Sequence, residues 1–145
     1  PFNATFADVS VDTETGIVTV NKIVSVSDCG QIINPKMAEG QAEGAIPQSI
    51  GMALSEYMIF DEKGKAINTD FTSYHIYTAI DMPEIIAEFV HTSDPTGPFG
   101  AKAVAEIPIN GPAPAIANAI YNACGVRIRE LPITPEKILR GLGKI

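Results

Sequence analysis

A carboxylate follows a run of small and apolar residues between Gly97 and Ile109, in which only Lys102 and Glu106 carry charge. The glycines and alanines of this run leave its backbone open to contact by a large ligand. A carboxylate in such surroundings loses hydration and becomes a stronger base. The pattern therefore predicts a general base at Glu106. The alternative is that Glu106 caps the next helix or faces water.

The ends of this run carry prolines. Pro98 and Pro108 restrict the backbone and remove a hydrogen-bond donor, which predicts neither a helix nor a central strand at these two places. The segment is therefore expected to be a stiff loop that depends on its neighbours for position.

The N-terminal part of the chain predicts a β-hairpin. Apolar and polar residues alternate from Thr5 to Asp12, as in a half-buried strand. Thr13–Gly16 ends in a glycine typical of a turn, and a β-branched run follows from Ile17 to Ser27.

A long helix is predicted from Pro35 to about Tyr57, with Asn34 as its N-cap. Its interior contains Pro47 and three glycines, although Gly costs about 1 kcal/mol and Pro about 3 kcal/mol in a helix interior. Either the helix approaches another backbone or a ligand closely, or it breaks into two pieces near Pro47.

The remaining elements are shorter, and with the hairpin they indicate an α+β fold. It would contain β-hairpins and short mixed strands, packed with two main helices and a short C-terminal helix. The predicted elements are a turn at Asp61–Gly64 between short extended pieces, an extended or irregular stretch over Phe71–Asp81, strands at Ile85–Val90 and Val126–Glu130, a helix over Ala113–Ala123 ended by Gly125, and a helix from Pro135 to Leu142 capped by Thr134.

Composition excludes several classes of protein. The 145 residues are 46% hydrophobic, which suits a single domain with one core, and no apolar run is long enough to span a bilayer. The net charge of −7 without a basic cluster argues against nucleic acid and anionic membrane as partners. Cys29 and Cys124 form no pairing motif, as expected in a reducing cytoplasm, and His75 and His91 have no ligand at metal-binding spacing.

Six motifs follow one another along the chain. They are Asp12–Gly16, Asp28–Gly30, Asn34-Pro35, Gly40–Gly44, Gly97–Glu106 and Arg127–Pro135. Together, over nearly the whole chain, they closely resemble the C-terminal part of the molybdopterin-binding subunit of the xanthine dehydrogenase and aldehyde oxidase family of molybdenum hydroxylases. The resemblance implies that residues 1–145 are the C-terminal segment of a larger molybdopterin-binding domain. The start at Pro1, without an initiator Met, is expected of a fragment or partial subunit.

The resemblance also implies roles for individual residues. Glu106 matches the catalytic glutamate, the base for a molybdenum-bound hydroxyl that attacks a substrate carbon while hydride passes to a terminal sulfur. Gln41 matches a glutamine that hydrogen-bonds the cofactor beside the metal, as an amide that both donates and accepts can do. Lys102, Ala103 and Val104, followed by Ala105, match the segment that runs along the cofactor, and no side chain is expected to bind the metal.

Two of these positions leave alternatives open. The side chain of Lys102 could point away from the cofactor as a solvated surface lysine. Many family members have Gly where this chain has Ala105. An alanine there would strain the loop by about 1 kcal/mol or more if φ were positive, and would cost nothing if φ were negative.

The cofactors and partners are likewise implied by the resemblance. Molybdopterin, plain or as its cytosine dinucleotide, is expected in the complete enzyme, whose substrate would be a small aldehyde or purine-like N-heterocycle. The chain has neither an iron–sulfur cysteine pattern nor a dinucleotide fingerprint, so iron–sulfur and FAD groups are expected on partner domains or subunits. The alternative hypothesis is a catalytically inert docking module. Separated from the upstream domain, the chain is expected to hold no cofactor and to expose an apolar surface.

Overall fold

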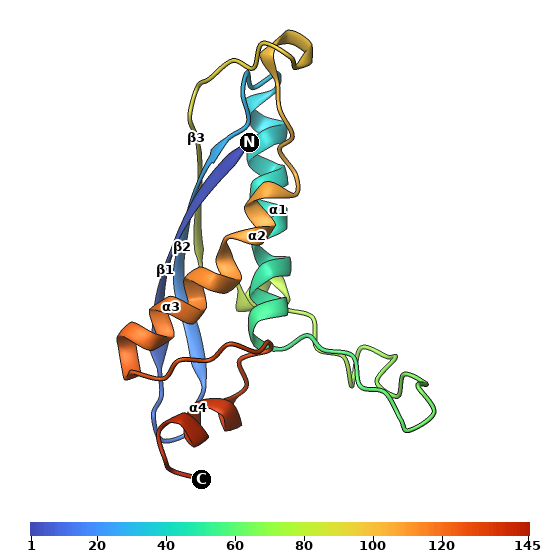
Figure 1. Ribbon diagram of the computed structural model, residues 1–145, viewed down its shortest axis with the longest axis vertical. Coiled ribbons are helices and arrows are strands. Elements are labelled where there is room, and N and C mark those ends of the chain that lie inside the picture. The colour runs from blue at the N-terminus through green and yellow to red at the C-terminus, as the bar shows by residue number, and fades with distance from the viewer.

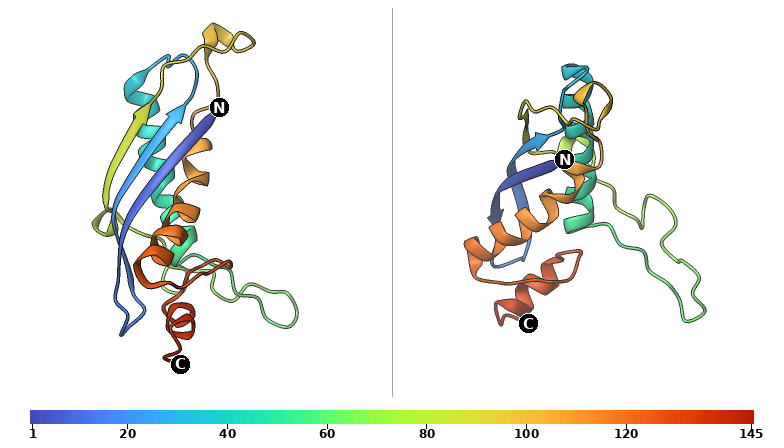
Figure 2. Two further views of the ribbon diagram at one scale, coloured as in Figure 1. Left: turned by 60° about the vertical axis from the view of Figure 1, so that its left-hand side comes forward. Right: turned by 45° about the horizontal axis from the view of Figure 1, so that its top comes forward.

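The computed structural model describes residues 1–145 as a three-stranded sheet whose one face is covered by helices (Figures 1 and 2). The strand order is β1-β2-β3. The α+β class expected from the sequence is confirmed. The elements in chain order are β1 (Phe2–Val11), β2 (Val18–Asp28), α1 (Pro35–Leu54), the 3₁₀ turn η1 (Ala79–Asp81), β3 (Glu84–Phe89), the 3₁₀ turn η2 (Pro98–Gly100), α2 (Ile107–Asn110), α3 (Pro112–Cys124) and α4 (Pro135–Gly141).

The predicted hairpin is present as the antiparallel pair β1–β2, with a register irregularity after Asp8. Asp8 pairs with Lys22, whereas Val9 pairs with Val20, so Asn21 is an extra residue in β2. Since side chains alternate along a strand, this bulge shifts the inward face of β2 by one position. Ile23 is thereby fully buried.

Strand β3 lies parallel to β2, from the pair Lys22–Glu84 to the pair Ser27–Phe89. Parallel neighbours need a long connection, and α1 with the loop after it supplies it. Because of this crossover, the segment that follows β3 starts beside the end of β2.

Helix α1 is one continuous helix, so the alternative of a break near Pro47 is wrong. The Asn34 side chain accepts a hydrogen bond from Met37 N at 3.1 Å, as predicted for an N-cap. One stripe of the helix is buried against the sheet and α3, and this packing outweighs the hydrogen bond lost at Pro47. The buried residues of the helix are Ala38, Ala42, Ala45, Ile46, Ser49, Ile50, Gly51 and Ala53.

The core lies between the sheet, α1, α3 and the C-terminal segment. It is built almost entirely from isoleucine side chains, which pack tightly because their branched β-carbons restrict rotation. Its buried members are Ile23, Ile46, Ile50, Ala53, Ile116, Ile120, Ile133 and Ile138.

Replacing Ile46 with alanine is expected to lower the free energy of unfolding by about 2–5 kcal/mol, because the site is completely enclosed and cannot collapse around the smaller side chain. The measurement is urea denaturation monitored by circular dichroism. Met52→Ala on the same helix is the control, since Met52 is 41% exposed. Equal losses in the two variants would contradict the assignment of Ile46 to the core.

Residues 56–76 form an arm that leaves the body of the molecule after α1 (Figures 1 and 2). Its only strand-like contact is the bridge between Phe60 and Ala66 around the turn at Asp61–Gly64. Asn68, 4% exposed, holds the base of the arm by accepting from Ile59 N and donating to Tyr57 O. The irregular stretch predicted over Phe71–Asp81 is confirmed, apart from the single turn η1.

Two local expectations are wrong. No strand forms over Val126–Glu130, because no neighbouring strand is available to pair with it. Short helical turns include both prolines, where we expected none: η2 begins at Pro98, and α2 begins at Ile107 with Pro108 in its first turn. Proline is tolerated in the first turn of a helix, where its missing N–H would have no partner. No helix is both long enough and apolar enough to cross a membrane.

Candidate functional site

A cleft of about 590 Å³ lies between α1 and the segment that enters α2. A volume of this size is within the range of small-molecule and cofactor sites. Amide side chains and one carboxylate supply its polar groups. Its lining residues are Gly40, Gln41, Gly44, Ala45, Gln48, Ala105, Glu106, Ile109 and Asn110.

The cleft brings together Gln41 of α1 and Glu106, two predicted site residues that are far apart in the sequence. Glu106 occupies the N-cap position of α2, but its side chain makes no capping hydrogen bond. The expected desolvation of Glu106 is wrong, since its side chain is exposed in this structure. The neighbouring alanines are too small to cover it.

The glycines of α1 explain how the cleft has room. A Cβ added at Gly40 or at Gly44 would have no atom within 4 Å. These two residues lie one turn apart on the face that also carries Gln41 and Gln48. The glycines therefore weaken the helix, but they place no side chain in the cleft.

A second, apolar hollow of about 190 Å³ adjoins the first, and Gln41 lines both. Lys102 and Val104 contribute to it from the loop, whereas Ala103 lines neither hollow. The segment therefore runs along both spaces. The hollow's lining comprises Cys29, Gln31, Ile32, Ile33, Asn34, Met37, Ala38, Gln41, Ala101, Lys102 and Val104.

The backbone N–H groups that follow Lys102 make no hydrogen bonds within the chain. None of the N–H groups from Ala103 to Glu106 donates one. Ala103, Ala105 and Glu106 are also exposed. Unpaired donors beside a cleft are available to a ligand with acceptor groups.

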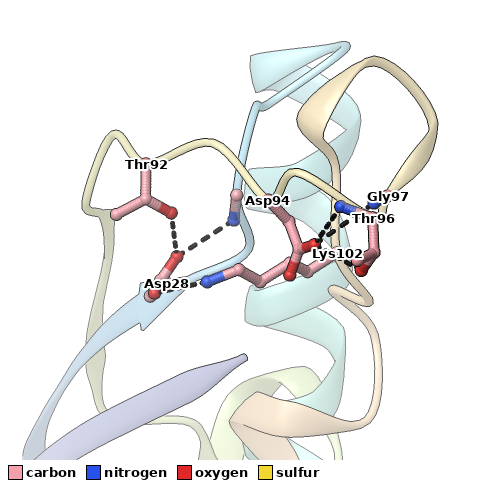
Figure 3. Close-up of polar contacts among 7 residues, drawn as sticks. Asp28, Thr92, Asp94, Thr96, Gly97 and Lys102 are labelled. Atoms are coloured by element: carbon pink, nitrogen blue, oxygen red, sulfur yellow. Dashed lines mark hydrogen bonds and ion pairs between the residues drawn. The ribbon is translucent and has the colours of Figure 1, made fainter.

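The Lys102 side chain is not a solvated surface lysine. Its Nζ lies 2.8 Å from Asp28 Oδ2, and the two side chains are only 14% and 16% exposed (Figure 3). Lys102, together with hydrogen bonds from Thr92 and from Gly30 N, holds the pKa of Asp28 far below its ordinary value of 3.8.

Ala105 causes no backbone strain. Phe99 is the only non-glycine residue with a positive φ, at 54°, so φ at Ala105 is negative and alanine costs nothing there. The unusual conformation lies instead at Phe99, a residue that is 91% exposed.

Sequence reasoning missed Gln48, Asn110 and the role of Asp28. Gln48 follows Gln41 by about two helical turns, a spacing that would have placed both amides on one face. Asn110 Nδ2 donates to the carbonyl oxygen of Glu106 at 3.3 Å, which no local motif indicates. Asp28 pairs with a residue that only the fold brings close.

No group of three or more His, Cys, Asp or Glu side chains is placed to hold a metal ion. His75 and His91 are exposed, and the two cysteines form no disulfide. Cys29 is 3% exposed, and burial raises the pKa of its thiol.

The molybdopterin cofactor-binding domain family matches this chain over residues 1–83, which is more than half of its length. The chain belongs to this family. The matched range contains the hairpin, α1 with Gln41, and the arm, whereas Glu106 lies after it.

The similarity to known relatives extends over the whole chain or nearly so. It is 45% identical to a probable hypoxanthine oxidase of Escherichia coli (strain K12), over 100% of this chain and 15% of that protein. It is 41% identical to a xanthine dehydrogenase molybdenum-binding subunit of Escherichia coli O157:H7, over 94% of this chain and 18% of that protein. The chain thus spans less than a fifth of the length of these relatives.

The fold agrees with solved structures as well. The crystal structure of the aldehyde oxidoreductase from Desulfovibrio desulfuricans ATCC 27774 matches with a TM-score of 0.83 and 41% identity, over 92% of this chain and 14% of that one. The predicted resemblance to the xanthine dehydrogenase and aldehyde oxidase group is therefore confirmed.

Proposed function

We propose that this molybdopterin-binding chain forms one wall of the active site of a molybdenum hydroxylase, with Glu106 as the general base. The observation that carries the proposal is the cleft itself, in which Gln41 from α1 and Glu106 from the loop lie on one 590 Å³ space. The substrate class is an aldehyde or a purine-like N-heterocycle, because the relatives include a probable hypoxanthine oxidase and an aldehyde oxidoreductase.

The residues present fit a pterin-type cofactor. Gly40 and Gly44 leave a cradle that any side chain would fill, and Gln41, Gln48 and Asn110 line it with amides that donate and accept. The free N–H groups of Ala103 and Ala105 add donors along the same path. When bound, the molybdenum cofactor supplies the oxidising equivalents and the oxygen atom that reaches the substrate.

Within this frame the chain's own residues have distinct roles. Gln41 would hold the cofactor from α1, and the backbone of Ala103–Ala105 would hold it from the loop. The Glu106 carboxylate would accept the proton released as the substrate is oxidised, and its exposure in the cleft lets it reach a bound group.

The rest of the enzyme must come from outside this chain. We propose that residues 1–145 are the C-terminal segment of the molybdopterin-binding domain and that an upstream domain closes the cleft. Iron–sulfur and flavin groups on other domains or subunits would carry the electrons away. Large exposed apolar side chains, among them Phe71, Ile80 and Phe99, supply surface for such contacts, as expected from the sequence.

A second hypothesis is supported by the same surface. On its own the chain would be a folded docking module without catalytic activity, because only one wall of the cleft belongs to it. The two hypotheses differ in what accompanies the chain in its native source.

The deciding experiment is purification from the native source, with metal analysis, pterin analysis and mass identification of the accompanying chains. Stoichiometric molybdenum and pterin, with this sequence in a larger polypeptide or complex, are expected. Purification of a solitary chain without metal would contradict the enzyme hypothesis and favour the docking module.

A further inference from the structure

The loop that carries Glu106 is attached to the sheet at one place, where β2 ends. Asp28 is the last residue of β2, and its carboxylate accepts hydrogen bonds from Thr92 Oγ1 and, at 3.0 Å, from Gly30 N. Its other oxygen is 2.8 Å from Lys102 Nζ (Figure 3). Both oxygens of the carboxylate therefore have partners within the chain.

Backbone contacts reinforce the same junction. Lys102 N donates to Cys29 O at 2.8 Å, and Gln31 N donates to Gly100 O at 2.8 Å. Gly30 and Ala101 form an isolated antiparallel bridge. A Cβ at Gly30 would lie 2.3 Å from Gly100 O, so the two segments are in close contact. The loop is thus fastened at Gly100–Lys102.

The charge of Lys102 is used inside the protein. Besides its contact with Asp28, its Nζ lies 5.9 Å from the centre of the Phe2 ring on β1. The Lys102 ammonium thus has a half-buried carboxylate partner and an aromatic neighbour within the chain. Lys102 does not line that cleft.

Between this junction and α2 the chain has no other fastening. No backbone N–H from Ala103 to Glu106 is hydrogen-bonded within the chain, and α2 is a single turn. Lys102 therefore fixes one end of the short segment that carries Glu106, and α2 with its buried Pro108 fixes the other, so a displacement at Lys102 changes the path of this segment. Catalytic groups are sensitive to such shifts, since a misplacement of about 1 Å can cost about 100-fold in rate.

We propose that the Asp28–Lys102 ion pair is a positioning device that sets where Glu106 stands in the cleft, and that Lys102 is not a cofactor ligand through its side chain. The proposal rests on the proposed function of Glu106. The low pKa of Asp28 keeps its carboxylate charged at every pH above the acid range, so protonation of Asp28 does not switch the device off near neutral pH.

The test uses the complete molybdenum-loaded enzyme and the variants Lys102→Met, Asp28→Asn and the double variant. Each single change is expected to lower kcat about 10- to 100-fold, while KM and molybdenum content stay within about twofold. The double variant should be no slower than the slower single variant, because both changes break one unit. Lys102→Arg keeps the cation and should lose less than Lys102→Met.

A readout independent of turnover is amide hydrogen exchange of the peptides that contain Gly30, Gln31 and Lys102. Exchange there should be about tenfold faster or more in Lys102→Met than in the unchanged enzyme, because the junction opens locally. Lys22→Met is the matched control. It removes a lysine from the Lys22–Glu84 pair, 3.0 Å apart but 37% and 61% exposed, and should change neither exchange nor kcat.

Several results would overturn the proposal. One is a kcat of Lys102→Met within twofold of that of the unchanged enzyme. Another is a double variant in which the losses of kcat of the two single variants add. The third is loss of molybdenum from Lys102→Met with unchanged hydrogen exchange, which would make Lys102 a cofactor ligand. If Lys102→Met does not fold, Thr92→Val tests the same junction by removing one donor to Asp28. Faster exchange with a several-fold lower kcat would support the proposal, and no change in either would overturn it.

Glu106→Gln, measured in parallel, separates this proposal from the proposed function. A nearly unchanged kcat in Glu106→Gln would show that Glu106 is not the base and would contradict the proposed function. If Glu106→Gln is inactive and Lys102→Met has an unchanged kcat, only the positioning role of the Asp28–Lys102 pair is contradicted.

Discussion

Replacing Glu106 with glutamine is expected to lower the rate at which substrate reduces molybdenum by about 10²–10⁴-fold, the usual contribution of a positioned general base. Glutamine has nearly the same shape as glutamate but cannot accept the proton. Since the side chain makes no hydrogen bond that the fold requires, the enzyme should remain folded and keep its cofactor. The measurement is stopped-flow reduction of the complete enzyme by substrate, with molybdenum content determined on the same sample.

The control for this prediction is Glu130→Gln. The Glu130 side chain is 86% exposed and its nearest cation, Lys137 Nζ, is 4.0 Å away, so the same chemical change there should leave the rate unaltered. A Glu106→Gln enzyme within about tenfold of the unchanged enzyme would take the role of base away from Glu106, because general bases contribute more than that.

Replacing Gly44 with leucine is expected to abolish most cofactor binding without harming the fold. The Cβ position at Gly44 is open, so the leucine side chain would occupy the cleft. Leucine also has a higher helix propensity than glycine, by about 1 kcal/mol. Overpacking of a fitted site costs about 1–3 kcal/mol, which corresponds to about 5- to 150-fold in affinity. Molybdenum per polypeptide and the melting temperature are the two measurements.

Glu39→Leu on the same helix distinguishes cleft filling from a general effect of added apolar surface. Glu39 is exposed and lines neither hollow, so its variant should retain molybdenum. A Gly44→Leu enzyme with full molybdenum content would show that the cofactor does not lie against α1.

Local elements were predictable because their causes are local. Asn34 and Pro35 start α1, Gly125 in the left-handed conformation ends α3, and Thr134 caps α4 through Lys137 N. Each of these effects acts within one turn of the chain. The continuity of α1 through Pro47 was left open, because it depends on how much of the helix is buried by other elements.

Pairing between distant segments was not predictable. The parallel register of β3 on β2, the unpaired stretch at Val126–Glu130 and the arm over residues 56–76 all depend on which partner a segment meets. An alternating pattern shows that a segment could be a strand and does not identify a neighbour. For the same reason the partner of Lys102 was missed, since Asp28 reaches it only through the fold.

By itself, then, the sequence determined the family, the α+β class, and Glu106 and Gln41 as the residues to examine, because motifs and their order are written in the chain. The tertiary structure alone decided that these two residues line one cleft, that Gly40 and Gly44 leave its floor open, and that Lys102 is paired with Asp28. Burial and contact are properties of distant segments brought together. A run of small residues around Glu106 could therefore suggest a dry site, although the fold leaves that carboxylate exposed.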